Sequence, residues 1–303
     1  MLLPLGFGQR STVTSLGRMV YYTAEKMPWM NLPTSSSDNL PNLLFLHGFG
    51  GGSSAYEWSK VYPAFAADYR VLAPDLVGWG RSEHPPRNYQ VDDYITTVIE
   101  FIEKTCGSAT DVIASSLTGA IAIRAAIVRP DLFKSLILTT PSGLSDFGTD
   151  YSKSLFAQIV STPILDRLLY STGIATDGGI RNFLEQRQFA DARRVYQEIV
   201  DAYLESALEP NAEYAALSFV RGDLSFDLSL YITQLTTPTA IIWGEKSQFT
   251  NPDIGKRLAN LNSEAIKVFQ PLENVGLTPH LEMPAVTIGL IRQYLNLLSD
   301  GSC

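Results

Sequence analysis

The chain has 303 residues, of which 45% are apolar and 18% charged, a composition typical of a soluble globular protein with a sizeable core. Acidic residues outnumber basic ones by 31 to 23, and the net charge of −8 argues against nucleic-acid binding through a basic face. The two cysteines, Cys106 and Cys303, cannot build a disulfide framework, and no Cys or His spacing matches a zinc site. No apolar run reaches the ~18 residues of a membrane span, and the N-terminus lacks the basic start of a signal peptide. We therefore expect a cytoplasmic protein without a transmembrane segment, a metal or a cofactor.

The N-terminal part of the chain predicts a β-hairpin. Thr12–Ser15 and Arg18–Tyr22 flank Gly17, and a proline-rich loop over Met27–Pro41 follows.

Further along the chain, strand and helix patterns alternate. Short apolar runs bounded by turn residues predict buried strands at Asn42–Leu46, Arg70–Ala73, Asp111–Ala114, Ser135–Leu138, Thr239–Trp243 and Ala265–Phe269. Helical patterns lie between and after them, at Ala55–Asp68, Val91–Lys104, Leu117–Arg129, Pro252–Ala259 and Pro284–Leu298. This alternation predicts an α/β fold with an open, mostly parallel sheet and helices on both faces.

The alternation breaks between residues 146 and 236, where strand signals stop and helical periodicity takes over. Asp191–Leu208 has the clearest helical pattern, with Asp191 as a candidate N-cap. Strand signals resume at Thr239, which favours a helical cap (146–236) inserted into one α/β core (1–145 and 237–303) over a separate helical domain. Aromatic and apolar residues of this segment either pack its helices together or line an apolar pocket against the sheet, namely Phe147, Tyr151, Leu155, Phe156, Leu165, Leu168, Leu169, Tyr170, Phe183 and Phe189.

Three motifs follow predicted strands. In His47–Gly52 (HGFGGG), glycines let the backbone turn tightly and expose N–H groups that can stabilise an oxyanion. Asp75–Ser82 follows the next strand, and Ala114–Gly119 (ASSLTG) opens a helix that we expect to be amphipathic. A strand, a tight turn, a serine and a helix form the arrangement that lifts a nucleophilic hydroxyl above a sheet edge. A nucleotide site is the rival explanation of the glycine-rich loop, but neither GxGxxG nor GxxxxGK[ST] is matched.

These motifs, in this order and spacing, resemble the α/β-hydrolase superfamily over nearly the whole chain. The similarity is to single-domain members with a helical cap, which include esterases, epoxide hydrolases, haloalkane dehalogenases and C–C bond hydrolases. The family patterns HGxxGxxxxW, DxxGxGxS, GHSxGG, WGxxD and GHxxHxExP have counterparts at His47–Trp58, Asp75–Ser82, Ala114–Gly119, Trp243–Ser247 and Gly276–Pro284. The resemblance implies an α/β-hydrolase fold. It places Ser116 at the nucleophile position and the N–H groups of Phe49 and Leu117 at the oxyanion-hole positions.

Besides Ala114 and Thr118, which replace glycines of GHSxGG, two catalytic positions depart from the family pattern. The WGxxD acid position holds Ser247, and the GHxxHxExP base position holds Leu277. A serine hydroxyl is a weak nucleophile that needs an adjacent base, and in a triad the acid orients that base. Leucine can neither accept a proton nor orient a partner, so we expect only trace activity unless another group replaces the histidine.

Three histidines are available as replacements. His47 belongs to the glycine-rich loop, where the family usually has a structural histidine, and His84 lies in a loop that we expect near the surface. His280, the second histidine of the GHxxHxExP pattern, is the remaining candidate base. The stretch after Ser135–Leu138, from which some relatives take their acid, has no carboxylate before Asp146.

Three functional hypotheses remain open at this point. The first is a protein with an incomplete triad that binds a small or lipophilic, apolar ligand, or a protein partner, under the cap. The second is an active serine hydrolase or esterase that uses Ser116 with a non-standard base, either His280 or a water held by Ser247. The third is lyase or cofactor-free oxygenase chemistry on the same fold.

Overall fold

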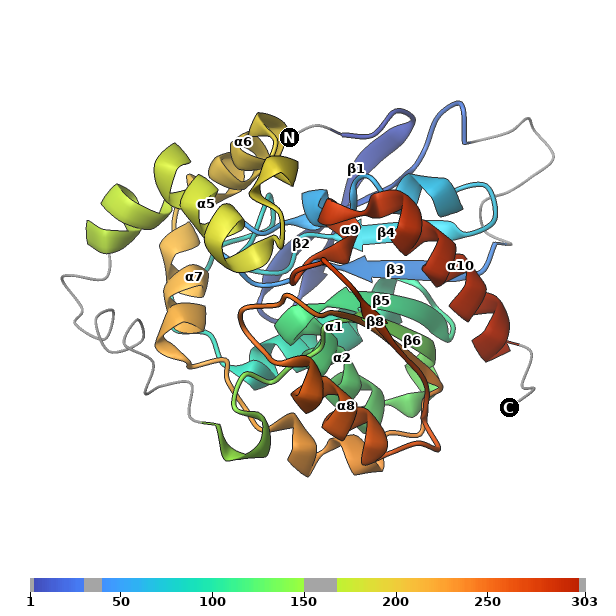
Figure 1. The fold of residues 1–303 in the computed structure, drawn as a ribbon. Helices are drawn as coiled ribbons and strands as arrows, with labels where there is room; N and C mark the ends of the chain where they lie inside the picture. The colour runs from blue at the N-terminus through green and yellow to red at the C-terminus, as the bar shows by residue number, and fades with distance from the viewer. Residues whose placement is uncertain (1–2, 30–39, 150–167, 300–303) are drawn as a thin grey trace.

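The computed structural model describes residues 3–29, 40–149 and 168–299 (Figure 1). Of the aromatic and apolar residues expected in the cap, Tyr151, Leu155, Phe156 and Leu165 lie outside these ranges, as does Cys303.

Within the described residues, eight strands form one sheet in the order β1-β2-β4-β3-β5-β6-β7-β8. β1 and β2 are antiparallel, β2 and β4 are antiparallel, and all the other neighbours are parallel. The strands are β1 (Phe7–Thr14), β2 (Gly17–Ala24), β3 (Asn42–Leu46), β4 (Arg70–Pro74), β5 (Thr110–Ser115), β6 (Phe133–Thr139), β7 (Thr239–Gly244) and β8 (Ile266–Leu272). Each predicted strand is therefore present, with its ends displaced by a few residues, and the mostly parallel sheet is confirmed.

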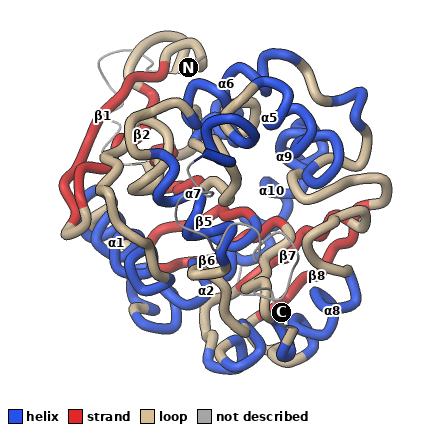
Figure 2. Tube along the Cα trace, turned by 90° about the vertical axis from the view of Figure 1, so that its left-hand side faces the viewer, coloured by secondary structure: helices blue, strands red, loops and turns tan. Residues whose placement is uncertain are grey.

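Helices cover both faces of this sheet (Figure 2). One face packs against α1 (Val91–Thr105), α2 (Ser116–Val128) and α8 (Pro252–Asn260), and the other packs against α10 (Pro284–Ser299) and two short 3₁₀ helices. The central strands alternate between the two layers, since Val112 of β5 joins the first apolar cluster and Ile113 joins the second. Continuous burial of β3, β5 and β7 follows from this double cover.

The predicted helix over Ala55–Asp68 is wrong. The segment forms two separate 3₁₀ helices, Ala55–Trp58 and Tyr62–Phe65. The side chain of Ser54 caps the first one, and Pro63 stands in the first turn of the second, where its missing N–H costs no hydrogen bond. The chain therefore forms two short helical turns in place of one helix, and Glu57 and Trp58 are buried in the first of them, Ala55–Trp58.

The helix after Ser116 also differs from the prediction, because α2 is buried on nearly all sides rather than amphipathic. Ten of its 13 residues are buried. The helix packs between the sheet, α1 and the 3₁₀ helix Ile232–Gln234, so no wide face of it reaches solvent.

The segment between β6 and β7 is helical in its described part and contains α5 (Asp177–Phe183), α6 (Gln197–Ala207) and α7 (Ala212–Arg221). Asp191 caps the 3₁₀ helix Ala192–Arg194 by accepting the Arg193 N–H, and α6 begins only at Gln197, so Asp191 does not cap the long helix as predicted. In Figure 1 these three helices lie together on the side of the sheet to which the tip of β3 points. Their buried side chains belong to the same apolar cluster as α1 and α2.

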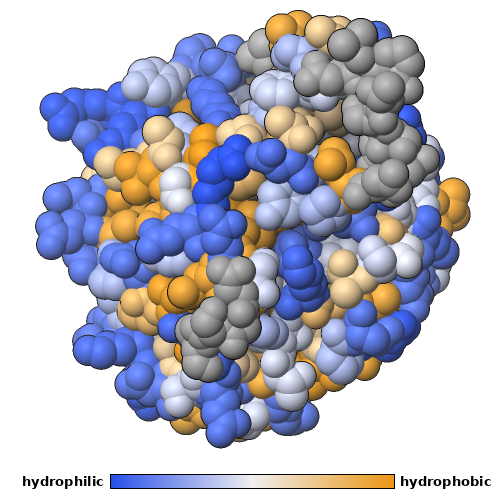
Figure 3. Space-filling view, turned by 90° about the vertical axis from the view of Figure 1, so that its right-hand side faces the viewer, coloured by the Kyte–Doolittle hydropathy of each residue, from blue (hydrophilic) through white to orange (hydrophobic). Residues whose placement is uncertain are grey.

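The outer surface carries both polar and apolar residues. On the face drawn in Figure 3, the two kinds are interspersed. In the part of the chain that the structure describes, no helix combines the length and the apolar composition needed to cross a lipid bilayer.

Candidate active site around Ser116

Ser116 stands at a strained turn between β5 and α2. It is the first residue of α2, directly after Ser115 at the end of β5, and its φ of 54° lies in the left-handed region. A side chain there costs of order 1–3 kcal/mol, which the surrounding structure must offset. Gly119 allows the turn to pack closely, because a Cβ at that position would lie 3.1 Å from Cβ of Pro141. The predicted strand, turn and helix around this serine are therefore present.

The loop after β3 packs directly on this turn. A Cβ at Gly48 would lie 3.6 Å from Cβ of Ser116. The next residue, Phe49, is buried with its ring 4.7 Å from Tyr94 and 5.2 Å from Trp79. Among the described residues, neither the Phe49 nor the Leu117 N–H donates a hydrogen bond. Both N–H groups, from the two positions expected for an oxyanion hole, are therefore unused by the described chain.

The residues at the expected acid and base positions lie in turns after β7 and β8. The backbone N–H of Ser247 donates to Gly244 O at 3.1 Å, and its hydroxyl is buried without a hydrogen-bond partner among the described residues. Leu277 is 5% exposed, and its N–H donates to Gln188 O at 2.8 Å. This last bond ties the base-position turn to the helical segment between β6 and β7.

Two of the three histidines brace loops. His47 Nε2 accepts the Leu76 N–H at 3.0 Å, which places the ring proton on Nδ1, 2.7 Å from Gly48 O. His84 is half-buried in the loop after β4, and its Nε2 lies 3.0 Å from Gly80 O. Burial lowers the pKa of His84. Both rings are therefore used in holding the loops that follow β3 and β4.

The third histidine, His280, is fully buried and stacks on Trp58 with ring centroids 3.8 Å apart. Its Nε2 lies 3.7 Å from Glu57 Oε2, beyond hydrogen-bond distance, and neither ring nitrogen has a hydrogen-bond partner in the described ranges. Burial lowers the pKa of His280, so the ring is neutral at pH 7. Within the same ranges, no histidine is hydrogen-bonded to Ser116 Oγ.

Sequence reasoning missed Glu57, the residue before Trp58 in the first motif. Its side chain is 1% exposed and accepts hydrogen bonds from Gly48 N–H at 2.8 Å and from the Tyr203 hydroxyl at 2.9 Å. Burial by itself raises the pKa of Glu57, but His280 and His47 lower it, to about 2. The only signal in the sequence was that Glu57 is the one acidic residue of this motif.

Asp146 is the first carboxylate after β6, and it too is buried. It accepts hydrogen bonds from the Ser142 hydroxyl at 2.6 Å and from the Leu228 N–H at 2.9 Å. Burial raises the pKa of Asp146. These contacts join the two ends of the helical segment, and in the described part of the chain none of them involves a histidine.

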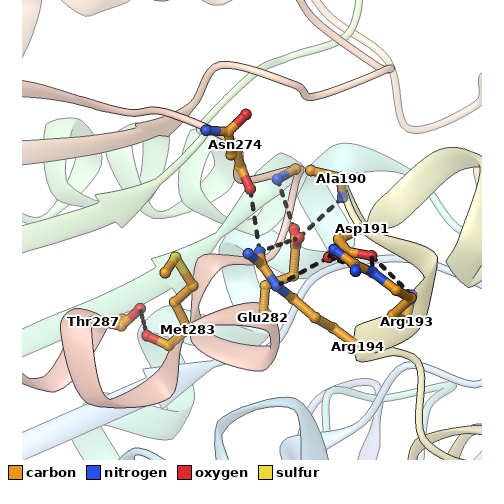
Figure 4. A network of polar contacts seen from close by, with 9 residues as sticks. Ala190, Asp191, Arg193, Arg194, Asn274, Glu282, Met283 and Thr287 are labelled. Atoms are coloured by element: carbon orange, nitrogen blue, oxygen red, sulfur yellow. Dashed lines mark hydrogen bonds and ion pairs between the residues drawn. The ribbon is translucent and has the colours of Figure 1, made fainter.

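Another buried carboxylate, Glu282, contacts both the turn after β8 and the helical segment (Figure 4). Its Oε1 accepts the Gly276 N–H at 2.6 Å, and its Oε2 accepts the Ala190 N–H at 2.9 Å. Arg194 pairs with the same Oε2 at 3.3 Å and donates to Asn274 O at 3.1 Å. The turn after β8 is therefore fastened to the helical segment from both sides.

Metal binding finds no support in these side chains. In the described ranges, no group of three or more His, Cys, Asp or Glu residues is arranged to hold a metal ion.

Comparisons with known proteins give consistent matches. A model of the alpha/beta hydrolase family matches residues 43–290. An uncharacterized hydrolase of Bacillus subtilis, YugF, is 28% identical over 246 residues, which cover 79% of this chain and 83% of that protein. Epoxide hydrolase 4 of Mus musculus is 25% identical over 228 residues, covering 71% of this chain but only 62% of that protein.

Solved structures resemble the fold at lower sequence identity. The epoxide hydrolase CorEH without ligand has a TM-score of 0.75 and 22% identity, covering 96% of this chain and 99% of that one. A serine hydrolase involved in carbazole degradation has a TM-score of 0.74 and 16% identity, with the same coverage of both chains. At these identities the likeness concerns the fold alone.

The strain at Ser116 leads to a first prediction. Ser116→Gly should raise the free energy of unfolding by about 1 kcal/mol, because glycine adopts a positive φ without steric cost. Ser116→Ala keeps the Cβ and should stay within about 0.5 kcal/mol of the wild type. Urea unfolding of the three proteins measures both values, and equal stabilities for the two variants would contradict the assigned backbone strain.

The buried carboxylate leads to a second prediction. Because the pKa of Glu57 is lowered from 4.5 to about 2 in the folded protein, the unfolded chain binds a proton first as the pH falls. The resulting stability is complete above pH 4.5 and is lost towards pH 2. Glu57→Gln removes this contribution, so its stability difference from the wild type should narrow by up to about 3 kcal/mol over that window. Urea unfolding between pH 6 and the acid limit of the fold measures the difference, and a constant gap would refute the assignment.

Proposed function

The chain belongs to the alpha/beta hydrolase family, and on that premise we propose that it binds a small or lipophilic ligand beside Ser116 with weak or no serine-hydrolase activity. The observation that carries the proposal is that each histidine has a contact other than Ser116. His47 and His84 contact backbone groups, and His280 is stacked on Trp58. Leu277, with its apolar side chain, occupies the position of the family's base.

A serine hydroxyl without an adjacent base attacks an ester far more slowly than one in a complete triad. In a serine protease triad, loss of the histidine alone costs about 10⁶-fold in kcat. At 1.36 kcal/mol per tenfold, this corresponds to about 8 kcal/mol of transition-state stabilisation. N–H donors and binding alone retain roughly 10³–10⁴-fold over water. Trace turnover with retained binding is the expected outcome.

The surroundings of the glycine-rich loop favour an apolar ligand. Positions 50 and 51 face the helical segment, since a Cβ at Gly50 would lie 3.2 Å from the Phe183 ring and one at Gly51 would lie 2.5 Å from Ile174. Phe183 in turn contacts Phe249, with ring centroids 6.1 Å apart. In this proposal, the Phe49 and Leu117 N–H groups bind a carbonyl oxygen of the ligand, and residues 146–236 act as a cap over a core formed by 1–145 and 237–303. We further propose a cytoplasmic location.

The proposal predicts little dependence of turnover on the serine. With p-nitrophenyl butyrate, the wild type and Ser116→Ala should hydrolyse ester at rates within about threefold of each other, because no base activates the hydroxyl. Initial rates at 400 nm measure this, with heat-unfolded protein as the control for surface-catalysed hydrolysis. A rate in the wild type that exceeds that of Ser116→Ala by three orders of magnitude would end the proposal.

An active serine hydrolase with a non-standard base is the second candidate, and the strain at Ser116 favours it. Backbone strain of this kind is concentrated at functional sites. His280, whose neutral ring has no hydrogen-bond partner among the described residues, is the base in this candidate, with Glu57 beside it as the acid. To act on Ser116, the ring would have to leave its stack on Trp58.

This second candidate predicts covalent labelling of Ser116 by a fluorophosphonate probe. Labelling should change little between pH 7 and 9, because the lowered pKa of His280 leaves the ring neutral over this range, and His280→Gln should reduce the rate by at least about 100-fold, the usual contribution of general-base catalysis. Mass spectrometry of the labelled peptide identifies the site, and Ser116→Ala is the negative control. Absence of labelling between pH 6 and 9 would exclude this candidate.

A further inference from the structure

Glu57 is a charged group that the proposed ligand site does not itself require. Burying a carboxylate costs several kcal/mol unless hydrogen-bond donors surround it. Its oxygens each have a donor, Gly48 N–H on Oε2 and the Tyr203 hydroxyl on Oε1. These two donors come from different parts of the fold, the loop after β3 and helix α6.

The first contact sets the loop that carries the Phe49 N–H. Gly48 precedes Phe49, so the peptide that Glu57 holds is the one next to the N–H assigned to the ligand site. A Cβ at Gly48 would lie 3.5 Å from Glu57 Oε2 and 3.6 Å from Cβ of Ser116. Gly48 is therefore close to both the carboxylate and the serine, and a shift of the carboxylate would move the loop relative to Ser116.

The second contact joins the same loop to the helical segment. Tyr203 lies in α6, and its hydroxyl donates to Glu57 Oε1 across 146 positions of sequence. Its backbone also meets the far end of the loop, since a Cβ at Gly52, where φ is +92°, would lie 2.0 Å from Tyr203 O. Tyr203 thus contacts the loop twice. Its backbone lies against Gly52, and its hydroxyl donates to the Glu57 carboxylate that accepts the Gly48 N–H.

The contacts continue to the turn at the base position. Gln188 Nε2 donates to the Tyr203 hydroxyl oxygen at 2.9 Å, and Gln188 O accepts the Leu277 N–H at 2.8 Å. Tyr203 and Gln188 are both at least nine-tenths buried. A continuous chain of hydrogen bonds thereby runs from the loop after β3, through the helical segment, to the turn after β8.

We propose that Glu57 is a positioning residue that sets the Phe49 N–H relative to Ser116, and that its bond to Tyr203 makes this setting depend on the docking of the helical segment. The proposal builds on the ligand site proposed above. It adds a specific consequence: displacement of α6 releases the loop and lowers the affinity of the N–H groups for a ligand oxygen. If Glu57 positions the loop, its loss changes the local opening of the loop. If its role were merely structural, its loss would change only the stability of the whole fold.

Hydrogen exchange of the loop tests this proposal in the full chain. Tyr203→Phe should accelerate amide exchange in a peptide spanning residues 45–53 about tenfold or more, because a hydrogen bond to a charged group is lost and the loop opens locally. Tyr56→Phe is the matched control. It removes another tyrosine–glutamate bond between the core and α6, from Tyr56 to Glu198 at 2.8 Å, and it removes no hydrogen bond of the Glu57 carboxylate. It should leave exchange in the loop within about twofold of the wild type.

Substitutions of Glu57 provide the second arm. Glu57→Gln keeps an oxygen that can accept the Gly48 N–H, so its loop should exchange more slowly than that of Glu57→Leu, which keeps no acceptor. If a variant is too unstable, exchange is compared at denaturant concentrations that match global stability.

Equal exchange in Tyr203→Phe and Tyr56→Phe, or equal exchange in Glu57→Gln and Glu57→Leu, would overturn the proposal. Exchange needs no turnover, so this result is independent of the ester assay that decides the proposed function.

Discussion

The turn between β5 and α2 is the constraint around which the site is built. The chain reverses within one residue, Ser116, whose positive φ holds its side chain at the end of the sheet. Such a turn leaves no room for large neighbours: Gly119 lies against Pro141, and Gly48 lies against Ser116 itself. Because β5 is central and both faces of the sheet are covered, the turn cannot relax outwards. The packing of α2, which is buried on nearly every side, offsets the free-energy cost of the strained backbone at Ser116.

The helical segment between β6 and β7 is part of the same constraint. Its apolar side chains join the cluster that α1 and α2 form on the sheet. Three of its polar contacts with the core go to the segments that follow β3 and β8: Tyr203 to Glu57, Gln188 to Leu277, and Arg194 to Glu282. Buried carboxylates supply two of these contacts, and each is satisfied by donors from both parts. The proposed ligand site and the packing of the helical segment therefore depend on the same contacts.

The serine turn and its polar surroundings point to different uses of the fold. The turn, the glycine-rich loop, and the N–H groups of Phe49 and Leu117, which donate no hydrogen bond within the described ranges, suit a developing oxyanion. The histidines, however, contact loop backbone or stack on Trp58. In the function proposed here, Leu277 and Ser247 stand at the positions of the base and the acid. The proposed site then keeps the groups that bind a carbonyl oxygen without a group that removes a proton, and this combination is the reason why we propose binding without efficient turnover.

The sequence by itself determined the strands, the order of the motifs and the identities of Ser116, Ser247 and Leu277, because each of these depends on residues close together along the chain. Apolar runs bounded by turn residues located the strands to within a few positions. The 3₁₀ helices around Glu57, the burial of α2 and the cap at Asp191 were decided by packing, which overrides local helical propensity.

Only the tertiary structure shows which residues Glu57 and His280 contact. Glu57 meets Tyr203 across 146 positions, and His280 meets Trp58 across more than 200, so no local pattern records either contact. A glutamate beside a tryptophan is compatible with an exposed turn as well as with a buried one. The fold removes water from that carboxylate and thereby makes its two hydrogen-bond donors obligatory.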